Sequence, residues 1–281
     1  MIVFLNGRFV PEEEAVVSVF DRSFLYGDGL FEAIRVYNAK PFRWTQHLDR
    51  LRQGAEFLGI RLADSFAELR TQTEELIQRN QMPECLLRMT LSRGVGIRGY
   101  SPKGADRPTL VMSLHPTPAI DPDHPLQWNL ATASLRVPAN DLLAIHKTCN
   151  KLHQVMARAE AESKGANEAL LLNTDGEVAE GASSNLCWVE NGTVCTTPLA
   201  SGILAGVTRS LVLELCQTLS LPTQEKGTKP NVLKTADAVF LTLTTVEIIE
   251  VIELDGHRLR RSPLVQQIHQ AYRRTVQRET S

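Results

Sequence analysis

Two short motifs in the second half of this chain contain the residue types that could carry out chemistry. The first, HKTCNKL at residues 146–152, places Lys147 after an apolar stretch, at the expected mouth of a helix. The second, GEVAEGASSN at residues 176–185, places Glu180 on an expected strand. A lysine amine can hold an aldehyde as a Schiff base, and a carboxylate can keep a pyridine nitrogen protonated so that the ring accepts electrons. Together the two side chains supply what pyridoxal phosphate chemistry requires.

The composition excludes several classes of function. The 281 residues carry a formal net charge of -2, which favours neither nucleic acid nor an anionic membrane as a partner. No apolar run approaches the ~20 residues of a membrane span, and the N-terminal residues lack the basic segment of a signal peptide. The 5 cysteines are scattered and form no CxxC pair, so we expect reduced thiols of a cytoplasmic protein, with no disulfide framework and no metal site.

A proline-rich segment divides the chain. Residues 116–125 (PTPAIDPDHP) contain prolines that exclude a helix or a central strand. We therefore expect a small N-terminal α/β domain over residues 1–118, a linker over 119–125, and a larger, strand-rich C-terminal domain over 126–281. The fold class is α+β.

Periodicity and turn residues predict the elements that must position the two motifs. A capping box of Ser65 and Glu68 should begin one helix, and Asn6-Gly7 should turn one hairpin. We expect helices at 46–58, 66–81, 150–164, 208–219 and 263–278. We expect strands at 3–10 (a hairpin), 29–37 with 41–44, 85–92, 109–115, 127–134, 168–172 with 177–181, 185–189 with 193–197, and 238–246.

The spacing of Lys147 to Asn150 and the Glu-Gly-x-Ser-Ser-Asn pattern at Glu180 resemble the class IV (fold type IV) pyridoxal-phosphate aminotransferases and their lyase relatives. The resemblance implies a pseudo-barrel in the C-terminal domain, Lys147 as the catalytic Schiff-base lysine, and Glu180 as the partner of the ring nitrogen. Ser183 and Ser184 would flank the ring. Without the resemblance, a lone lysine near a helix start is usually a solvated surface charge.

The same resemblance implies a site for the cofactor phosphate. Val207 and Thr208 lie where the helix is expected to start, after Gly206, and free N–H groups at a helix start bind phosphate. Thr244 would add a hydroxyl. Arg50, in the pattern His-x-x-Arg-Leu, corresponds to the arginine that clamps the phosphate. The plainer alternatives are an N-cap for Thr208 and an exposed helix residue for Arg50.

The expected substrate contacts lie in the first half of the chain. Tyr26, Phe31, Glu32 and Arg35 correspond to pocket positions of the family, although the apolar ones could equally be core. The loop RGVGIRGYSP at residues 93–102 presents an arginine and a tyrosine suited to gripping a carboxylate, and in relatives it reaches a neighbouring subunit, which implies a homodimer. A plain surface loop is the alternative. The loop residues concerned are Arg98 and Tyr100.

The clues to the reaction disagree. FEAIR at residues 31–35 looks like branched-chain and D-amino-acid aminotransferases, whereas the 93–102 loop and Asn150-Lys151-Leu152 resemble 4-amino-4-deoxychorismate lyase, which releases pyruvate and 4-aminobenzoate. We favour amino transfer between an amino acid and a 2-oxo acid, with the lyase as the alternative. The third possibility is a scaffold that binds a ligand without turnover. The intact set of Lys147, Glu180 and Arg50 argues against it.

Overall fold

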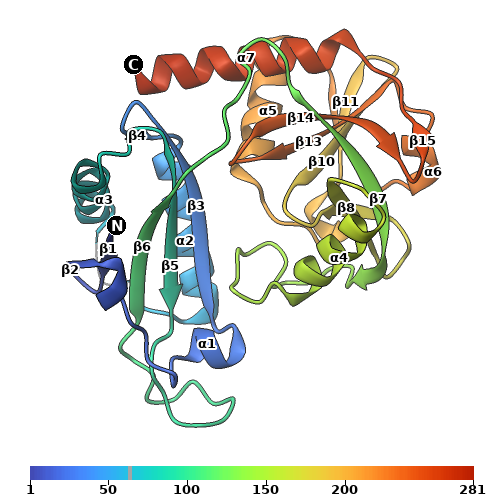
Figure 1. Ribbon diagram of the computed structural model, residues 1–281. Coiled ribbons are helices and arrows are strands. Elements are labelled where there is room, and N and C mark those ends of the chain that lie inside the picture. The colour runs from blue at the N-terminus through green and yellow to red at the C-terminus, as the bar shows by residue number, and fades with distance from the viewer. Residues whose placement is uncertain (63–64) are drawn as a thin grey trace. The chain divides into compact units, whose positions relative to one another are not determined.

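The computed structural model of the chain describes residues 1–62 and 65–281, which form two compact units (Figure 1). Unit 1 comprises residues 1–117, 146–151 and 278–281, and unit 2 comprises residues 118–145 and 152–277. The division into two domains around 119–125 stays a prediction, because compact packing alone does not establish that a part folds by itself.

Unit 1 is built on a six-stranded sheet with the strand order β2-β1-β6-β5-β3-β4. Alternate residues of its central strands pack against two helices in one core, as the period of two in a strand requires. The strands are β1 (Ile2–Leu5), β2 (Arg8–Pro11), β3 (Gly29–Tyr37), β4 (Lys40–Pro41), β5 (Cys85–Ser92) and β6 (Thr109–His115). The helices are α1 (Arg22–Tyr26), α2 (Trp44–Leu58) and α3 (Phe66–Asn80).

Two local signals in unit 1 are confirmed. Asn6 and Gly7 have φ values of 47° and 85°, the left-handed pair of residues that a tight hairpin turn between β1 and β2 needs. At the start of α3 the backbone N–H of Glu68 donates to Ser65 Oγ at 3.2 Å, and the backbone N–H of Ser65 donates to Glu68 Oε2 at 2.7 Å. The capping box therefore forms as predicted.

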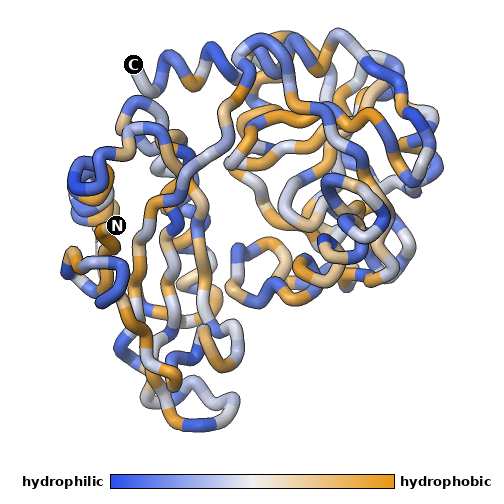
Figure 2. Tube along the Cα trace, in the orientation of Figure 1, coloured by the Kyte–Doolittle hydropathy of each residue, from blue (hydrophilic) through white to orange (hydrophobic). Residues whose placement is uncertain are grey.

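Unit 2 contains a nine-stranded sheet that curls into a half-barrel. Its central strands are apolar over most of their length, as the orange tube at β13 and β14 in Figure 2 shows. The strands are β7 (Leu126–Val137), β8 (Glu168–Asn173), β9 (Val178–Gly181), β10 (Asn185–Glu190), β11 (Thr193–Thr196), β12 (Thr223–Glu225), β13 (Ala238–Leu243), β14 (Glu247–Leu254) and β15 (His257–Arg258). The helices are α4 (Leu152–Ser163), α5 (Val207–Thr218), α6 (Pro230–Leu233) and, ending in unit 1, α7 (Pro263–Thr280).

Several boundaries differ from the sequence-based expectation. The run at 238–246 is not one strand, because β13 ends at Leu243 and a turn leads into β14, which pairs with it antiparallel. The helix expected from residue 150 begins only at Leu152, and the residues expected at 41–44 are split between β4 and the start of α2. None of the helices in the described ranges combines the length and apolar content that crossing a lipid bilayer requires.

Candidate active site

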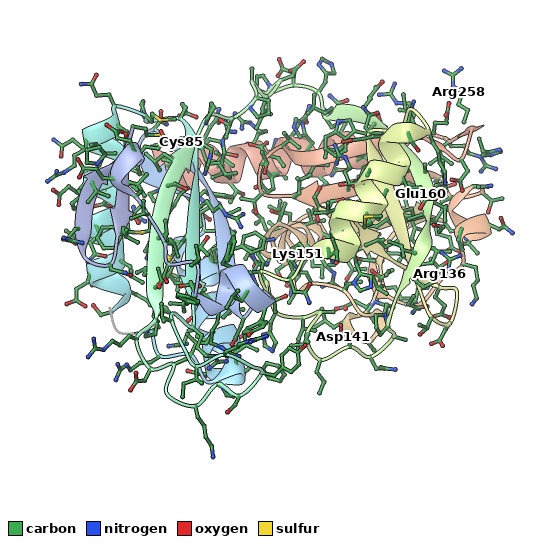
Figure 3. The ribbon with its side chains drawn as sticks, turned by 60° about the horizontal axis from the view of Figure 1, so that its bottom comes forward. Cys85, Arg136, Asp141, Lys151, Glu160 and Arg258 are labelled. Atoms are coloured by element: carbon green, nitrogen blue, oxygen red, sulfur yellow. The ribbon has the colours of Figure 1, made fainter. Side chains whose placement is uncertain are left out.

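Lys147 lies in an extended segment beside β3 rather than at a helix start. The backbone N–H of Phe31 donates to Lys147 O at 2.9 Å, and that of Cys149 donates to Gly29 O at 2.8 Å. Thr148 forms an isolated antiparallel bridge with Leu30. Because side chains alternate along extended backbone, Lys147 shares a side of the sheet with Phe31. Lys151, labelled in Figure 3, follows four residues later, immediately before α4.

Two contacts within unit 1 fix this segment further. The imidazole of His146 stacks on Phe57 of α2 with ring centres 4.4 Å apart. Gly27, which ends α1 with a φ of 69°, lets the backbone of Asn150 approach so closely that a Cβ at Gly27 would lie 3.1 Å from the Asn150 Cα. Lys147 and Asn150, the two ends of the Lys-x-x-Asn motif, are therefore both held by contacts within unit 1.

Arg50 forms a buried ion pair on the helix-covered side of the same sheet. Its Nε donates to Glu32 Oε1 at 2.8 Å and its Nη2 donates to Glu32 Oε2 at 2.7 Å. His47 Nδ1 lies 2.7 Å from Glu32 Oε2. Glu32 has no exposed surface, so the structure places it in the core rather than among pocket-lining residues.

Phe31 lies beside two cations. Lys147 Nζ lies 4.8 Å from the centre of its ring, and the guanidinium carbon of Arg88 in β5 lies 4.1 Å from it. Burial lowers the pKa of Arg88. The sequence interpretation missed Arg88, although its position opposite Ala33 in the register of β3 and β5 puts it on the same side as Phe31.

The loop at residues 93–102 is held by α1. The Arg22 guanidinium donates to the carbonyls of Gly99, Tyr100 and Ser101 at 2.9, 3.1 and 3.1 Å. The Tyr26 hydroxyl accepts from the backbone N–H of Gly99 at 3.1 Å, and its ring meets that of Tyr100 edge-on. Tyr26 thus contributes to the shape of the loop.

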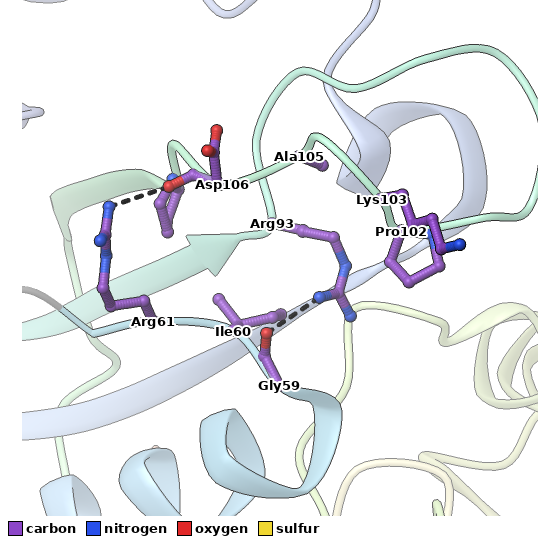
Figure 4. Close-up of a pocket in the computed structure, with 9 residues that line it drawn as sticks. Gly59, Ile60, Arg61, Arg93, Pro102, Lys103, Ala105 and Asp106 are labelled. Atoms are coloured by element: carbon purple, nitrogen blue, oxygen red, sulfur yellow. Dashed lines mark hydrogen bonds between the residues drawn. The ribbon is translucent and has the colours of Figure 1, made fainter.

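The base of this loop borders a cavity of about 310 Å³ in unit 1 (Figure 4). Here Arg93 donates to the carbonyls of Gly59 and Leu58 at 3.1 and 2.7 Å and to Asp28 Oδ2 at 2.7 Å. These bonds make Arg93 an anchor. The tip of the loop is different, since Arg98 is exposed and Tyr100 is 88% exposed.

Arg35, the remaining residue expected in the substrate pocket, lies near the far end of β3. Its guanidinium carbon lies 5.1 Å from the centre of the Tyr37 ring. Its Nη2 lies 3.9 Å from Glu84 Oε2. Arg35 is buried, whereas Arg98 at the loop tip is exposed.

In unit 2, Glu180 on β9 accepts two hydrogen bonds from neutral donors. The side-chain amide of Asn185 donates to Glu180 Oε2 at 2.9 Å, and the backbone N–H of Leu204 donates to the same oxygen at 3.0 Å. The Asn185 amide also donates to Leu204 O at 2.9 Å. One asparagine therefore ties the carboxylate to the segment that precedes α5.

The N-terminus of α5 is shaped by the same asparagine. A Cβ at Gly206, the N-cap of the helix, would lie 1.8 Å from Asn185 Oδ1, so a larger residue there would displace the Asn185 side chain. Within the described ranges no side chain caps this helix by a hydrogen bond. Val207 and Thr208 are the first two residues of the helix, and their N–H groups are of the kind that a helix leaves without an internal partner. This end of α5 suits an anion.

Hydroxyl groups complete the unit 2 cluster. Ser183 Oγ donates to the buried Glu168 Oε2 at 2.5 Å. Ser184 Oγ is buried and has no hydrogen-bond partner among the described residues, and the same holds for Thr242 Oγ1, whose residue pairs with Asn185 in the sheet. Thr244 is half-buried in the turn after β13. Buried polar atoms of this kind normally find a partner, which a bound polar ligand can supply.

The structure distributes the predicted site residues over the two units. Unit 1 contains the predicted Schiff-base lysine, the arginine predicted to bind the phosphate, and the residues predicted to bind substrate, namely Lys147, Arg50, Tyr26, Phe31, Arg35, Arg98 and Tyr100. Unit 2 holds the carboxylate, the hydroxyls and the helix start, namely Glu180, Ser183, Ser184, Val207, Thr208 and Thr244. Sequence reasoning assigned no role to Asn185, Thr242 and Arg88. For Asn185 the signal was its place in the motif of Glu180.

Comparison with known proteins gives a consistent result. The model of the family described as amino-transferase class IV matches residues 29–254. A Methanocaldococcus jannaschii protein, provisionally named a branched-chain amino acid aminotransferase, is 35% identical over 91% of this chain and 88% of its own length. The D-alanine aminotransferase of Bacillus licheniformis is 33% identical over 100% of this chain and 99% of its own.

Solved structures are similar over nearly the whole chain. The branched-chain aminotransferase of Thermoproteus uzoniensis with norvaline has a TM-score of 0.92 at 32% identity, covering 99% of this chain and 95% of that one. The 4-amino-4-deoxychorismate lyase of Pseudomonas aeruginosa has a TM-score of 0.85 at 33% identity, covering 97% and 98%. The T.th. branched-chain aminotransferase with pyridoxamine 5'-phosphate has a TM-score of 0.91 at 29% identity, covering 99% and 94%.

Proposed function

This chain belongs to the class IV aminotransferase family, and we propose that it is a pyridoxal-phosphate enzyme that moves an amino group between an amino acid and a 2-oxo acid. The observation that carries the proposal is the pair of preserved clusters, Lys147 beside β3 and Glu180 tied to the start of α5. The relative that contains pyridoxamine 5'-phosphate supports the cofactor.

The donor set fits this cofactor. Its phosphate requires N–H groups and cations, which α5 and Arg50 offer, and its ring nitrogen requires a carboxylate, which Glu180 offers. The buried hydroxyls of Ser184 and Thr242 can donate to an incoming acceptor. When bound, pyridoxal phosphate supplies an aldehyde that condenses with amines and a ring that takes up electron density.

Lys147 and Glu180 have separate tasks in the proposed reaction. The Lys147 amine would hold the cofactor aldehyde. As a free amine it would be the base that takes up and returns the proton of the substrate α-carbon, which is general acid–base catalysis by one group. Glu180 keeps the proton on the ring nitrogen, because an anion beside a protonated nitrogen raises its pKa. Asn185 and the Leu204 amide hold that carboxylate in place.

Each unit by itself offers groups suited to a phosphate. In unit 2 these are the N–H groups of Val207 and Thr208 and the hydroxyls of Thr208 and Thr244, and in unit 1 it is the Arg50 guanidinium. Ser183 and Ser184 flank the ring. Phe31 packs on the substrate, and the exposed Arg98 and Tyr100 bind its carboxylate; Tyr26 shapes their loop, and Arg35 completes the pocket.

The identity of the substrate separates two candidate reactions. The named relatives favour a branched-chain or D-amino acid as the amino donor. A lyase acting on 4-amino-4-deoxychorismate is the second candidate, since the Pseudomonas aeruginosa lyase is 33% identical over nearly the full chain. Both reactions use the same lysine and carboxylate, so the substrate decides between them.

The test is a substrate panel on the purified yellow protein. L- and D-amino acids are each paired with 2-oxoglutarate or pyruvate, and aminodeoxychorismate is supplied alone. We expect amino transfer with one stereochemical series; pyruvate release from aminodeoxychorismate without amino transfer would favour the lyase. Borohydride reduction and peptide mapping should place the pyridoxyl group on Lys147. A colourless protein that binds no pyridoxal phosphate would refute the enzyme proposal.

We further propose a cytoplasmic homodimer. The support is a group of exposed apolar side chains on and around α1 and the 93–102 loop, of the kind that protein interfaces cover, comprising Val19, Phe20, Phe24, Val95 and Ile97. All five cysteines are unpaired, which suits a reducing compartment. Light scattering on a size-exclusion column should give twice the 31.2 kDa chain mass.

A further inference from the structure

Glu32 breaks the apolar pattern of the core in unit 1. It lies on β3 between Leu30 and Ile34, which belong to the apolar core under α2 and α3, and none of its surface is exposed. A carboxylate at such a position is costly unless charged or hydrogen-bonding partners surround it. An apolar residue at this position would stabilise unit 1 equally well, so stability alone does not explain why a carboxylate is buried here.

Glu32 binds one edge of the Arg50 guanidinium. Both hydrogen bonds from Arg50 use the edge formed by Nε and Nη2, at 2.8 and 2.7 Å. Two parallel bonds of this kind fix the plane of the guanidinium and therefore the direction in which Nη1 points. A free arginine side chain populates many rotamers, and the pairing removes this freedom before any anion binds.

His47 is the third hydrogen-bond partner of Glu32. Burial alone would raise the pKa of Glu32, but the Arg50 charge and the hydrogen bonds from His47 and Arg50 lower it to about 2. Burial lowers the pKa of His47, and the bond to Glu32 opposes this without reversing it. At neutral pH the imidazole is therefore uncharged and its Nδ1 donates to a charged carboxylate. The Glu32 oxygens thus receive three hydrogen bonds from α2.

We propose that Glu32 and His47 are positioning residues for Arg50, so that the affinity for the cofactor phosphate depends on a carboxylate that does not touch it. The inference rests on the proposed function, in which Arg50 binds that phosphate. The negative charge of Glu32 by itself would repel a phosphate. Orientation outweighs this repulsion, because Arg50 already neutralises the carboxylate charge.

The test compares two ligands that differ only in the phosphate. Full-length protein, freed of cofactor by dialysis, is titrated with pyridoxal phosphate and with pyridoxal, and binding is followed by absorbance. In Glu32→Gln the side chain is neutral and has only one oxygen that can accept a hydrogen bond from Arg50. We expect it to bind pyridoxal phosphate about tenfold more weakly, the effect of one weakened charge-assisted bond, while pyridoxal affinity stays within about twofold of wild type.

A matched control is available in unit 2. Glu250 on β14 is also a buried carboxylate, and Arg261 binds it through the same two nitrogens, at 2.8 and 2.7 Å. Glu250→Gln therefore reproduces the loss of a buried charge without touching Arg50. The ratio of the dissociation constants for pyridoxal phosphate and pyridoxal should match wild type in Glu250→Gln but change in Glu32→Gln.

A double-mutant cycle tests whether Glu32 acts through Arg50. In an Arg50→Ala background, Glu32→Gln should change the ratio by less than about twofold, because the group that it orients is gone. His47→Gln, which leaves the Glu32–Arg50 pair intact, should give a smaller loss in the same direction, and it serves if Glu32→Gln does not fold.

Three outcomes would overturn the inference while the proposed function stands. They are an equal loss for both ligands, tighter binding of pyridoxal phosphate by Glu32→Gln, and a full Glu32→Gln effect in the Arg50→Ala background. If wild-type protein does not bind pyridoxal phosphate, the proposed function fails and the inference fails with it.

Discussion

Glu32 in unit 1 and Glu180 in unit 2 are both strand carboxylates, but different kinds of donor hold them. Glu32 is fully buried and binds the charged Arg50 side-on, with His47 as a third donor. Glu180 is half-buried and accepts from the neutral amides of Asn185 and Leu204. Neutral donors orient a carboxylate without cancelling its charge, whereas a guanidinium cancels it.

The same chemical group thus serves two purposes in this chain. A carboxylate that is neutralised inside the core can hold another side chain in place, and its loss should appear first as lost stability. A carboxylate that neutral groups hold at a half-buried position can act on a ligand, and its loss should appear first as lost turnover. Substitutions at Glu32, Glu180 and Arg98 test this contrast.

The largest effect is expected for Glu32→Ala. Removing one partner of a buried ion pair leaves Arg50 in the core without its carboxylate, which typically costs about 3–5 kcal/mol of stability. Urea unfolding of cofactor-free protein, followed by circular dichroism, measures it. Glu180→Ala, which removes the two hydrogen bonds from neutral amides, should lower the free energy of unfolding by less than half as much. Equal losses would erase the contrast.

Protonation of Glu32 at low pH should lower the free energy of unfolding. Its pKa falls from 4.5 to about 2 on folding, so the folded state holds this carboxylate charged more tightly than the unfolded state does. The resulting stability, about 3 kcal/mol, is present above pH 4.5 and is lost as the pH falls towards 2. Urea midpoints between pH 6 and pH 2 should therefore fall less steeply in Glu32→Gln than in wild type. Parallel curves would contradict the assignment.

Glu180→Gln should affect turnover rather than stability. Glutamine keeps an oxygen for Asn185 and Leu204, but it cannot hold a proton on the ring nitrogen by charge. We expect a loss of about 3 kcal/mol of transition-state stabilisation, a more than hundredfold fall in kcat/KM, with bound cofactor retained. Single-turnover absorbance measurements separate this loss from weaker substrate binding. Near-normal turnover would place the ring-nitrogen partner elsewhere.

Arg98→Ala should give the smallest effect and separate the two arginines. Arg98 is exposed at the loop tip, whereas Arg50 is locked by Glu32. Loss of one charge-assisted bond to a substrate carboxylate costs about 2 kcal/mol, a roughly thirtyfold fall in kcat/KM, with cofactor content unchanged. If every active substrate is used as before, the loop is structural only. The substrate that is affected also distinguishes amino transfer from the lyase reaction.

Local patterns in the sequence were enough to predict much of the fold. The Asn6-Gly7 turn, the Ser65–Glu68 capping box and the alternating residues of β5 and β6 depend on neighbours in the chain, and all three are present. The family was identified from the motifs around Lys147 and Glu180, because their spacing is itself local. The roles of the individual site residues stay predictions.

Only the tertiary structure decided what each side chain meets. The sequence placed Lys147 at a helix start, but pairing with β3 draws residues 147–149 into an extended segment that β3 hydrogen bonds stabilise. It placed Glu32 in a pocket, but the register of β3 turns that side chain towards α2, where Arg50 and His47 bind it. Periodicity shows that a strand has two faces. Which face the helices cover, and which charged side chain from elsewhere in the chain contacts a residue on it, depends on long-range packing that no local pattern encodes.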